Sequence, residues 1–123
     1  MNYLDLSSIS AYNRSFKLAN YIWDIAIKWD YFSKKTIGLQ LVRSTDSISA
    51  NIAEGFGRYT KKDKINFYRY SFGSLKETQD WIEKAKVRNL ISAEDYLYIN
   101  SELKNLPREL YQLIHFTNEK LQI

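Results

Sequence analysis

The fold is decided by a stretch in the first half of the chain, residues 37–57, which reads IGLQLVRSTDSISANIAEGFG. Its core-facing side chains recur three or four positions apart, the spacing of one face of an amphipathic helix. They are Ile37, Leu41, Thr45, Ile48 and Ile52. Serines and alanines fill much of the C-terminal half, which lets a second helix approach closely. We predict a helix over about 34–55, ended by Gly55 in a left-handed conformation.

The same three- and four-residue spacing of apolar side chains appears on both sides of this stretch. It predicts further helices over about 8–30, 61–88 and 93–118. The connections between them are short, so neighbouring helices are expected to run antiparallel. The sequence therefore predicts an all-α fold, an up-down-up-down four-helix bundle that occupies residues 1–123 as a single domain.

Single residues mark the expected beginnings and irregularities of these helices. Thr60 and Ser92 each begin a segment with the pattern of a helix N-terminal cap. Pro107 lies inside the fourth helix and lacks a backbone donor, which predicts a kink or a restart there. Gly73 lies inside the third helix, where a glycine costs about 1 kcal/mol relative to alanine. We therefore expect another group to approach the chain closely at Gly73.

Composition excludes several classes of protein. The 123 residues include no cysteine, which excludes disulfide scaffolds, zinc ribbons and cysteine nucleophiles. With 4 glycines and 1 proline, the chain has too few turn signals for an all-β fold. Met1–Leu6 has no basic region, so we expect no secretory signal. The most apolar run, Tyr21–Ile27, contains Asp24 and is too short to span a membrane, so we expect a cytoplasmic protein.

The first predicted helix carries two adjacent apolar stripes. One contains Tyr12, Phe16 and Trp23, and the other contains Leu18 and Ile22. A single bundle of this size buries mostly one side of each helix, and aromatic residues make up 15% of the chain. We therefore expect one of the two stripes to be buried against identical copies of the chain, in a homo-oligomer.

No catalytic, metal or cofactor site is predicted from motifs. The chain has 1 histidine, His115, which cannot supply the paired histidines of a di-iron bundle. P-loop, EF-hand, zincin and nucleophile-elbow spacings are absent. Paired carboxylates at Glu54 and Glu77 are the remaining enzymatic alternative, and we expect a protein without catalytic activity.

A group of polar residues on the second and third predicted helices forms the first candidate site. Arg43, Asn51 and Glu54 share one face of the second helix, and Ser74 and Glu77 interrupt the aromatic stretch of the third. We predict a structural polar seam in which the two groups meet and fix the register of the helices. The alternative is a solvated face.

The second candidate site is basic. The segment between the second and third helices is rich in lysine and arginine and lies beside tyrosines, and the chain carries a net charge of +4. Such residues neutralise phosphates, and tyrosines stack on unpaired bases. The candidate contacts to RNA or DNA are Arg58, Lys61, Lys62, Lys64 and Arg69. An ordinary solvated loop is the alternative.

Two motifs carry a resemblance to a known family. Residues 47–55 read SISANIAEG and residues 73–77 read GSLKE. The chain resembles the four helix bundle proteins encoded within intervening sequences of bacterial large-subunit (23S) ribosomal RNA genes. The family often has a proline and a glutamate before the second helix, whereas this chain reads YFSKKT over residues 31–36.

The resemblance implies a fold, an assembly and a set of partners. The implied fold is a left-handed up-down bundle that assembles as a ring-like homopentamer, with no known enzymatic activity. A relative serves as the accessory protein of diversity-generating retroelements and partners a reverse transcriptase and nucleic acid. Cyclic symmetry would place every basic loop at the same end, which favours polyanions. We therefore expect a pentamer that binds RNA or DNA. The alternative is a protein-interaction scaffold or reverse-transcriptase accessory subunit that binds no nucleic acid directly.

Overall fold

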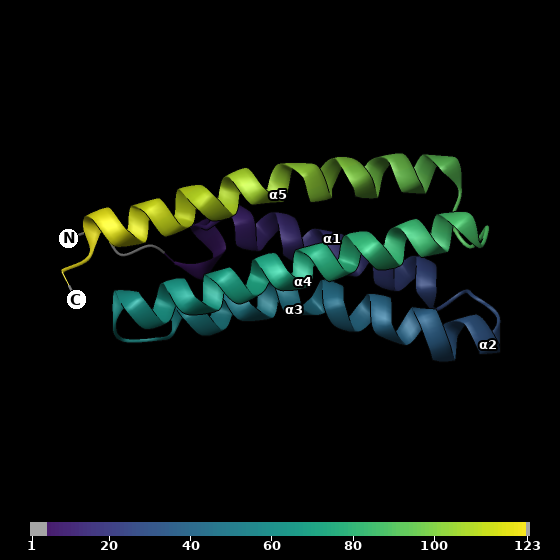
Figure 1. Cartoon of the computed structure of the whole chain (residues 1–123), viewed down its shortest axis with the longest axis horizontal. Coiled ribbons are helices and arrows are strands. Elements are labelled where there is room, and N and C mark those ends of the chain that lie inside the picture. The colour runs from purple at the N-terminus through teal and green to yellow at the C-terminus, as the bar shows by residue number, and fades with distance from the viewer. Residues whose placement is uncertain (1–4, 123) are drawn as a thin grey trace.

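The computed structural model describes residues 5–122, and the regular secondary structure of these residues is entirely helical, without a strand. These residues form four long helices, which extend along the long axis of the molecule (Figure 1). They are α1 (Ser10–Ala26), α3 (Leu39–Phe56), α4 (Lys61–Val87) and α5 (Ala93–Lys120). The predicted all-α class with four helices is confirmed, while part of the Met1–Leu6 segment lies outside the described residues.

Three short helical elements lie before α1 and between α1 and α3. A 3₁₀ turn, η1 (Leu6–Ser8), precedes α1, and the one-turn helix α2 (Tyr31–Ser33) continues into a π-helical turn, η2 (Lys34–Gly38). The first predicted helix was therefore too long, since it ends at Ala26 and not at residue 30. Asp30 instead begins the next segment, where its carboxylate accepts a hydrogen bond from the backbone N–H of Ser33 at 3.1 Å.

Both predicted N-terminal caps are confirmed. The Thr60 hydroxyl accepts a hydrogen bond from the backbone N–H of Asp63 at 3.1 Å, at the start of α4. The Ser92 hydroxyl accepts one from the backbone N–H of Asp95 at 3.0 Å, at the start of α5. Each cap satisfies a donor that has no partner within its own helix, which fixes where the helix begins.

The predicted role of Gly55 is wrong. No described glycine has a positive φ angle, and α3 continues through Gly55 to Phe56. A Cβ atom at Gly55 would lie 2.7 Å from Cε1 of Tyr68 and 2.8 Å from the carbonyl oxygen of Lys64. The residue is a glycine because α4 approaches the backbone of α3 at this point, and not because the helix turns there.

Helix α4 contains a second glycine with the opposite environment. Nothing in the described part of the chain lies within 4 Å of a Cβ atom built at Gly73. The expected close approach is therefore not made within a single copy. Helix α5 runs through Pro107 without restarting, and its axis curves gently along its length in Figure 1.

The core lies between the four long helices and contains the side chains that the spacing predicted. Leu41, Ile48 and Ile52 of α3 are fully buried, as the pattern in residues 37–57 required. They pack with other fully buried side chains, namely Leu18, Ile22, Tyr68, Leu75, Ile82, Ile99, Leu103, Leu106 and Leu110. None of the helices within residues 5–122 has an apolar stretch long enough to cross a bilayer.

A charged cluster joins α1 to α5. The Arg14 guanidinium donates to Glu102 at 2.8 Å through Nη1 and to Glu109 at 2.5 Å through Nε. The hydrogen bond to Glu109 raises the pKa of Arg14. Glu109 is buried, and its Oε2 atom has no hydrogen-bond partner within residues 5–122. Glu102 and Glu109 lie seven positions apart and therefore share one face of α5. This spacing is visible in the sequence, but our predictions did not use it.

Candidate nucleic-acid interface

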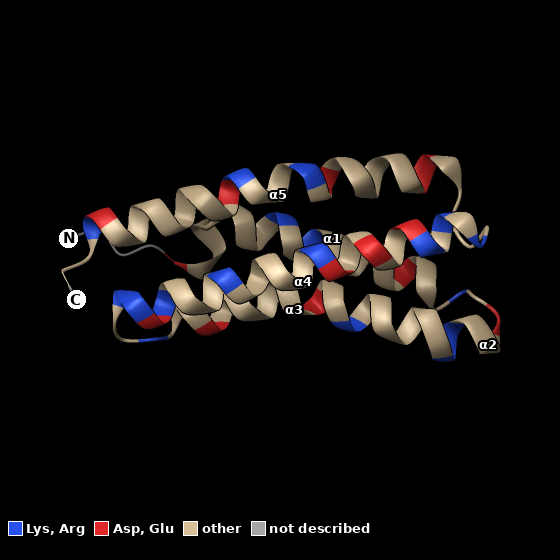
Figure 2. Cartoon of the chain, viewed as in Figure 1, with Lys and Arg blue, Asp and Glu red and all other residues tan. Residues whose placement is uncertain are grey.

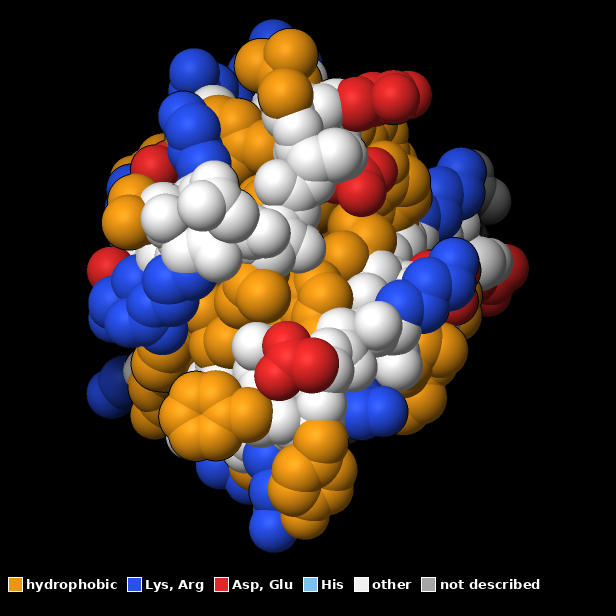
Figure 3. All heavy atoms as spheres, turned by 90° about the vertical axis from the view of Figure 1, so that its right-hand side faces the viewer, with side chains coloured by type: hydrophobic (Ala, Val, Ile, Leu, Met, Phe, Trp, Pro, Cys, Tyr) orange, Lys and Arg blue, Asp and Glu red, His pale blue; other side chains and the backbone are white. Residues whose placement is uncertain are grey.

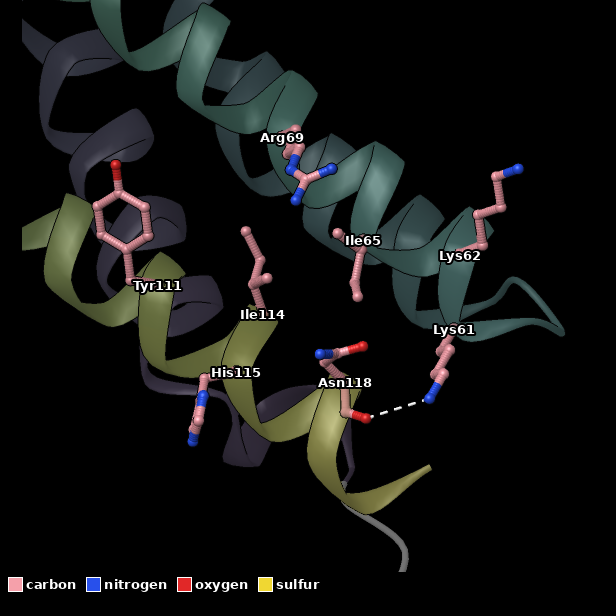
Figure 4. Close-up of a pocket in the computed structure, with 8 residues that line it drawn as sticks. All are labelled: Lys61, Lys62, Ile65, Arg69, Tyr111, Ile114, His115 and Asn118. Atoms are coloured by element: carbon pink, nitrogen blue, oxygen red, sulfur yellow. Dashed lines mark hydrogen bonds between the residues drawn. The ribbon is translucent and has the colours of Figure 1, made fainter. Parts of the chain in front are cut away.

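An open groove of about 580 Å³ lies between the beginning of α4 and the end of α5. Its walls are formed by residues of these two helices (Figure 4), which are Lys61, Lys62, Ile65, Arg69, Tyr111, Ile114, His115 and Asn118. The lining holds two lysines, one arginine and no carboxylate. A groove of this composition attracts anions, since nothing along its surface neutralises the positive charge.

The groove has an apolar floor and basic edges. Figure 4 shows Ile65 and Ile114 pointing into the space between the two helices. The Lys61 ammonium reaches across to α5 and donates to the backbone carbonyl of Asn118 at 3.2 Å. Lys62 and His115 point outward in the same view. The arrangement leaves the charges of Lys62 and Arg69 unpaired by any ion pair within the described residues.

The position of the two lysines is unfavourable for the helix that carries them. Lys61 and Lys62 lie in the first turn of α4, where the helix dipole is positive and cations typically cost 0.3–1 kcal/mol. Lys61 offsets this cost by donating to a carbonyl in the last turn of α5, where a cation is favoured. No ion pair or hydrogen bond of its side chain within residues 5–122 offsets this cost for Lys62.

Two of the five predicted basic residues are engaged elsewhere. Arg58 pairs with Glu54 at 3.1 Å, and its guanidinium carbon lies 4.4 Å from the ring centre of Phe67. Lys64 donates to the carbonyl of Phe56 at 2.7 Å, at the end of α3, and burial lowers its pKa. The structure therefore gathers Lys61, Lys62 and Arg69 at the groove, and separates Arg58 and Lys64 from it.

The residues of the predicted polar seam bond within their own helices. Asn51 donates to the carbonyl of Ser47 at 2.9 Å, and Glu77 accepts from the indole N–H of Trp81 at 3.1 Å. Glu54 pairs with Arg58, as described above. Within residues 5–122, none of the five seam residues (Arg43, Asn51, Glu54, Ser74 and Glu77) makes a side-chain hydrogen bond or ion pair between α3 and α4. A role for them at a contact between copies stays a prediction.

Smaller side chains make the polar link between α3 and α4. The Ser71 hydroxyl donates to the carbonyl of Ile48 at 2.8 Å, and the Thr78 hydroxyl donates to the Ser44 hydroxyl at 3.0 Å. Ser44, Ser71 and Thr78 are all buried. The seven-residue interval from Ser71 to Thr78 places both on one face of α4, a signal available in the sequence.

The far end of the bundle carries a different surface. Figure 3 shows apolar side chains between scattered charges on this end. A second pocket of about 370 Å³ lies there, formed by Phe32, Ser33, Thr36, Ile37, Arg88 and Leu90. Tyr31, Phe32 and Val87 are exposed on the same end of the molecule. The two ends of the bundle thus differ in chemistry, since one offers a basic groove and the other a surface where apolar side chains and charges are mixed.

Comparison with known proteins identifies the family. The sequence profile of the 23S rRNA-intervening sequence protein family matches residues 7–112. The chain belongs to this family. The match includes the α4 wall of the groove and Tyr111, while His115 and Asn118 follow the matched range. No curated protein matches the chain.

A solved structure shares the fold of this family member. It is the crystal structure of a protein with unknown function from the S23 ribosomal protein family of Bacteroides thetaiotaomicron, superposed with a TM-score of 0.75. The two chains are 24% identical, and the superposition covers 85% of this chain and 97% of the other. At this identity the likeness concerns the fold alone. Among residues 5–122, no group of three histidine or acidic side chains is arranged to hold a metal ion.

Proposed function

We propose that this family member is a non-enzymatic cytoplasmic protein, an antiparallel up-down bundle that forms a homo-oligomer and binds RNA or DNA in the groove between α4 and α5. The observation that carries this proposal is the lining of the groove, with Lys61, Lys62 and Arg69 and no carboxylate. Phosphate contacts supply most of the sequence-independent affinity for nucleic acid. The short connections at residues 57–60 and 88–92 favour antiparallel neighbours.

The exposed aromatic side chains of α1 support the homo-oligomer. Two aromatic members of one of the two apolar stripes predicted for this helix remain outside the core, with Phe16 50% and Trp23 51% exposed. Ile27, one turn beyond Trp23, is also exposed. Burial of a large apolar side chain contributes about 1.5–3 kcal/mol, so covering this stripe with another copy is favourable. A ring of five copies, which the resemblance implies, would bring the grooves together at one end.

Salt dependence tests the nucleic-acid function. Binding of a fluorescent RNA oligonucleotide by fluorescence anisotropy should weaken steeply with salt, with a log–log slope of about −0.7 to −0.9 for each phosphate contact. Lys62→Glu and Arg69→Glu should each reduce affinity and flatten this slope. Lys17→Glu on α1 is the matched control, because Lys17 is exposed and does not line the groove between α4 and α5. Equal slopes for all four proteins would refute the proposal.

The apolar pocket at the far end favours one alternative, a scaffold that recruits a partner protein such as a reverse transcriptase. Phe32 lines that pocket and is exposed. A scaffold would bind its partner independently of salt and lose it on Phe32→Glu, while Lys62→Glu would have no effect. An enzymatic role for Glu54 and Glu77 has less support, because both side chains are exposed on helix surfaces and neither lines a described pocket.

A further inference from the structure

A line of cations continues from the groove along the outer face of α4. Lys62, Arg69 and Lys76 follow one another at intervals of seven residues, so they lie on nearly the same side of the helix. Fourteen residues of α-helix rise about 21 Å, which is the length of this line. All three side chains are exposed. Figure 2 shows the basic positions spaced along α4.

The cations of this line are not neutralised within the chain. The ion pairs among residues 5–122 involve Arg14, Arg58 and Lys84, and none involves a member of the line. The line ends at Lys76, because Asp80 follows on the same side and pairs with Lys84 at 2.6 Å. The positive charge is therefore continuous from the groove to the middle of α4 and stops there.

Gly73 lies between the last two cations, one turn from each. A glycine within a helix lowers its stability relative to alanine, so it requires a reason. Packing within the chain does not give one, since a Cβ atom at Gly73 would meet nothing within 4 Å. The backbone of α4 is thus uncovered at Gly73, where a ligand strand bound by Arg69 and Lys76 would cross the helix.

Two exposed tyrosines lie beside the line of cations. Tyr111 of α5 is 65% exposed at the edge of the groove, with its ring centre 4.8 Å from that of Phe72. Tyr70 of α4 is 51% exposed, and its hydroxyl accepts a hydrogen bond from Asn66 at 3.1 Å. Neighbouring groups hold both rings while leaving aromatic surface open. Such surfaces stack on unpaired bases, whereas the bases of a duplex are already stacked on one another.

We infer that the ligand of the groove is a single strand, whose backbone follows Lys62, Arg69 and Lys76 across Gly73 while a base stacks on Tyr111. This inference rests on the proposed function and adds the form of the nucleic acid and its path. It also gives Gly73 a role, since any side chain there would hold the sugar-phosphate backbone away from the helix.

The test compares a labelled 12-nucleotide oligouridine with a 12-base-pair RNA duplex by fluorescence anisotropy at low salt. The single strand should bind at least tenfold more tightly. Gly73→Leu should weaken binding of the strand about tenfold without lowering the melting temperature, because the added side chain extends into open space. Tyr111→Ala should also weaken it about tenfold, as expected for the loss of one stacked base. Lys76→Gln should reduce the salt slope by about 0.7.

Two control variants match these changes at positions away from the line. Tyr31→Ala removes an exposed tyrosine at the far end of the bundle, and Lys17→Gln removes a charge from α1. Both should bind the strand as the unchanged protein does. If the duplex binds as tightly as the strand, or Gly73→Leu binds normally, the inference is wrong while the proposed function stands. If neither probe binds, both are wrong.

Discussion

Two helical glycines, one on α3 and one on α4, lie in opposite environments. Gly55 of α3 faces α4 and has no space for a Cβ atom, which would lie 2.7 Å from Cε1 of Tyr68. Gly73, on the outer face of α4, has nothing within 4 Å of the same atom. Both glycines are helical and neither has a positive φ angle. The first is explained by packing within the chain, and the second is explained only by something outside it.

This difference separates residues that hold the bundle together from residues available for binding. Tyr68, Ser71 and Thr78 face α3 and are buried. Lys62, Arg69 and Lys76 face outward and are exposed. Substitutions on the inner face should therefore change stability, whereas those on the outer face should change binding.

The largest effect is expected for Gly55→Ala. The added methyl group would overlap the Tyr68 ring and the carbonyl of Lys64, and overpacking of this kind typically costs 1–3 kcal/mol. A loss of about 2 kcal/mol corresponds to a decrease of roughly 6–10 °C in the melting temperature of a domain of this size. Thermal unfolding followed by circular dichroism measures it, and an unchanged melting temperature would contradict the close approach of α4.

The second effect is a loss of stability at alkaline pH. Burial raises the pKa of the Tyr68 phenol to about 12, against an unfolded value near 10.0. Because the folded pKa is the higher one, this contribution to stability is complete below pH 10 and is lost between about pH 10 and 12. Urea unfolding at several pH values should show the decrease, and Tyr68→Phe should reduce it. Tyrosinate absorbance should show that Tyr68→Phe removes one late-ionising phenol, while Tyr21, whose hydrogen bond to Asp95 also raises its pKa to about 12, still ionises late.

The third effect concerns the buried hydroxyls between α3 and α4. Ser71→Ala removes the hydrogen bond to the carbonyl of Ile48 and should lower the free energy of unfolding by about 1 kcal/mol. Ser74→Ala is the matched control, since it makes the same change three residues further along a less buried part of α4. Equal losses in the two variants would show that α3 and α4 are not joined by Ser71.

The smallest effect has the opposite sign. Gly73→Ala should raise the free energy of unfolding by about 0.5–1 kcal/mol, because alanine favours the helix and the position has space for its methyl group. The same substitution would then stabilise the protein at Gly73 and destabilise it at Gly55. A destabilised Gly73→Ala variant would indicate that this face of α4 is packed in the assembled protein.

The helices were predictable because their signals are local. The spacing of Leu41, Ile48 and Ile52 and the caps at Thr60 and Ser92 are each encoded within a few residues. The end of α1 was not predictable from spacing, because Trp29 and Phe32 continue the apolar pattern beyond the turn. In the structure Trp29 lies beyond the end of α1, and its indole N–H donates to the carbonyl of Leu90 at 2.8 Å.

The candidate site was predictable only in part. The sequence identifies a basic segment, but the selection among its members depends on α5, which lies far away along the chain. Lys61 and Arg69 face Tyr111 and Asn118, whereas Lys64 turns toward α3. The roles of Gly55 and Gly73 could not be predicted either, because the sequence does not show whether another helix covers a glycine within a helix.

The contact between Arg14 and Glu109 has a consequence for the order of folding. The other helix contacts, α3 with α4 and α4 with α5, join neighbours along the chain, whereas these two residues lie 95 positions apart. Local contacts of this kind form early, while the entropy of closing a long loop delays the distant one. We therefore expect the ion pair to form after the transition state, so that replacing Arg14 should speed unfolding and leave the folding rate nearly unchanged.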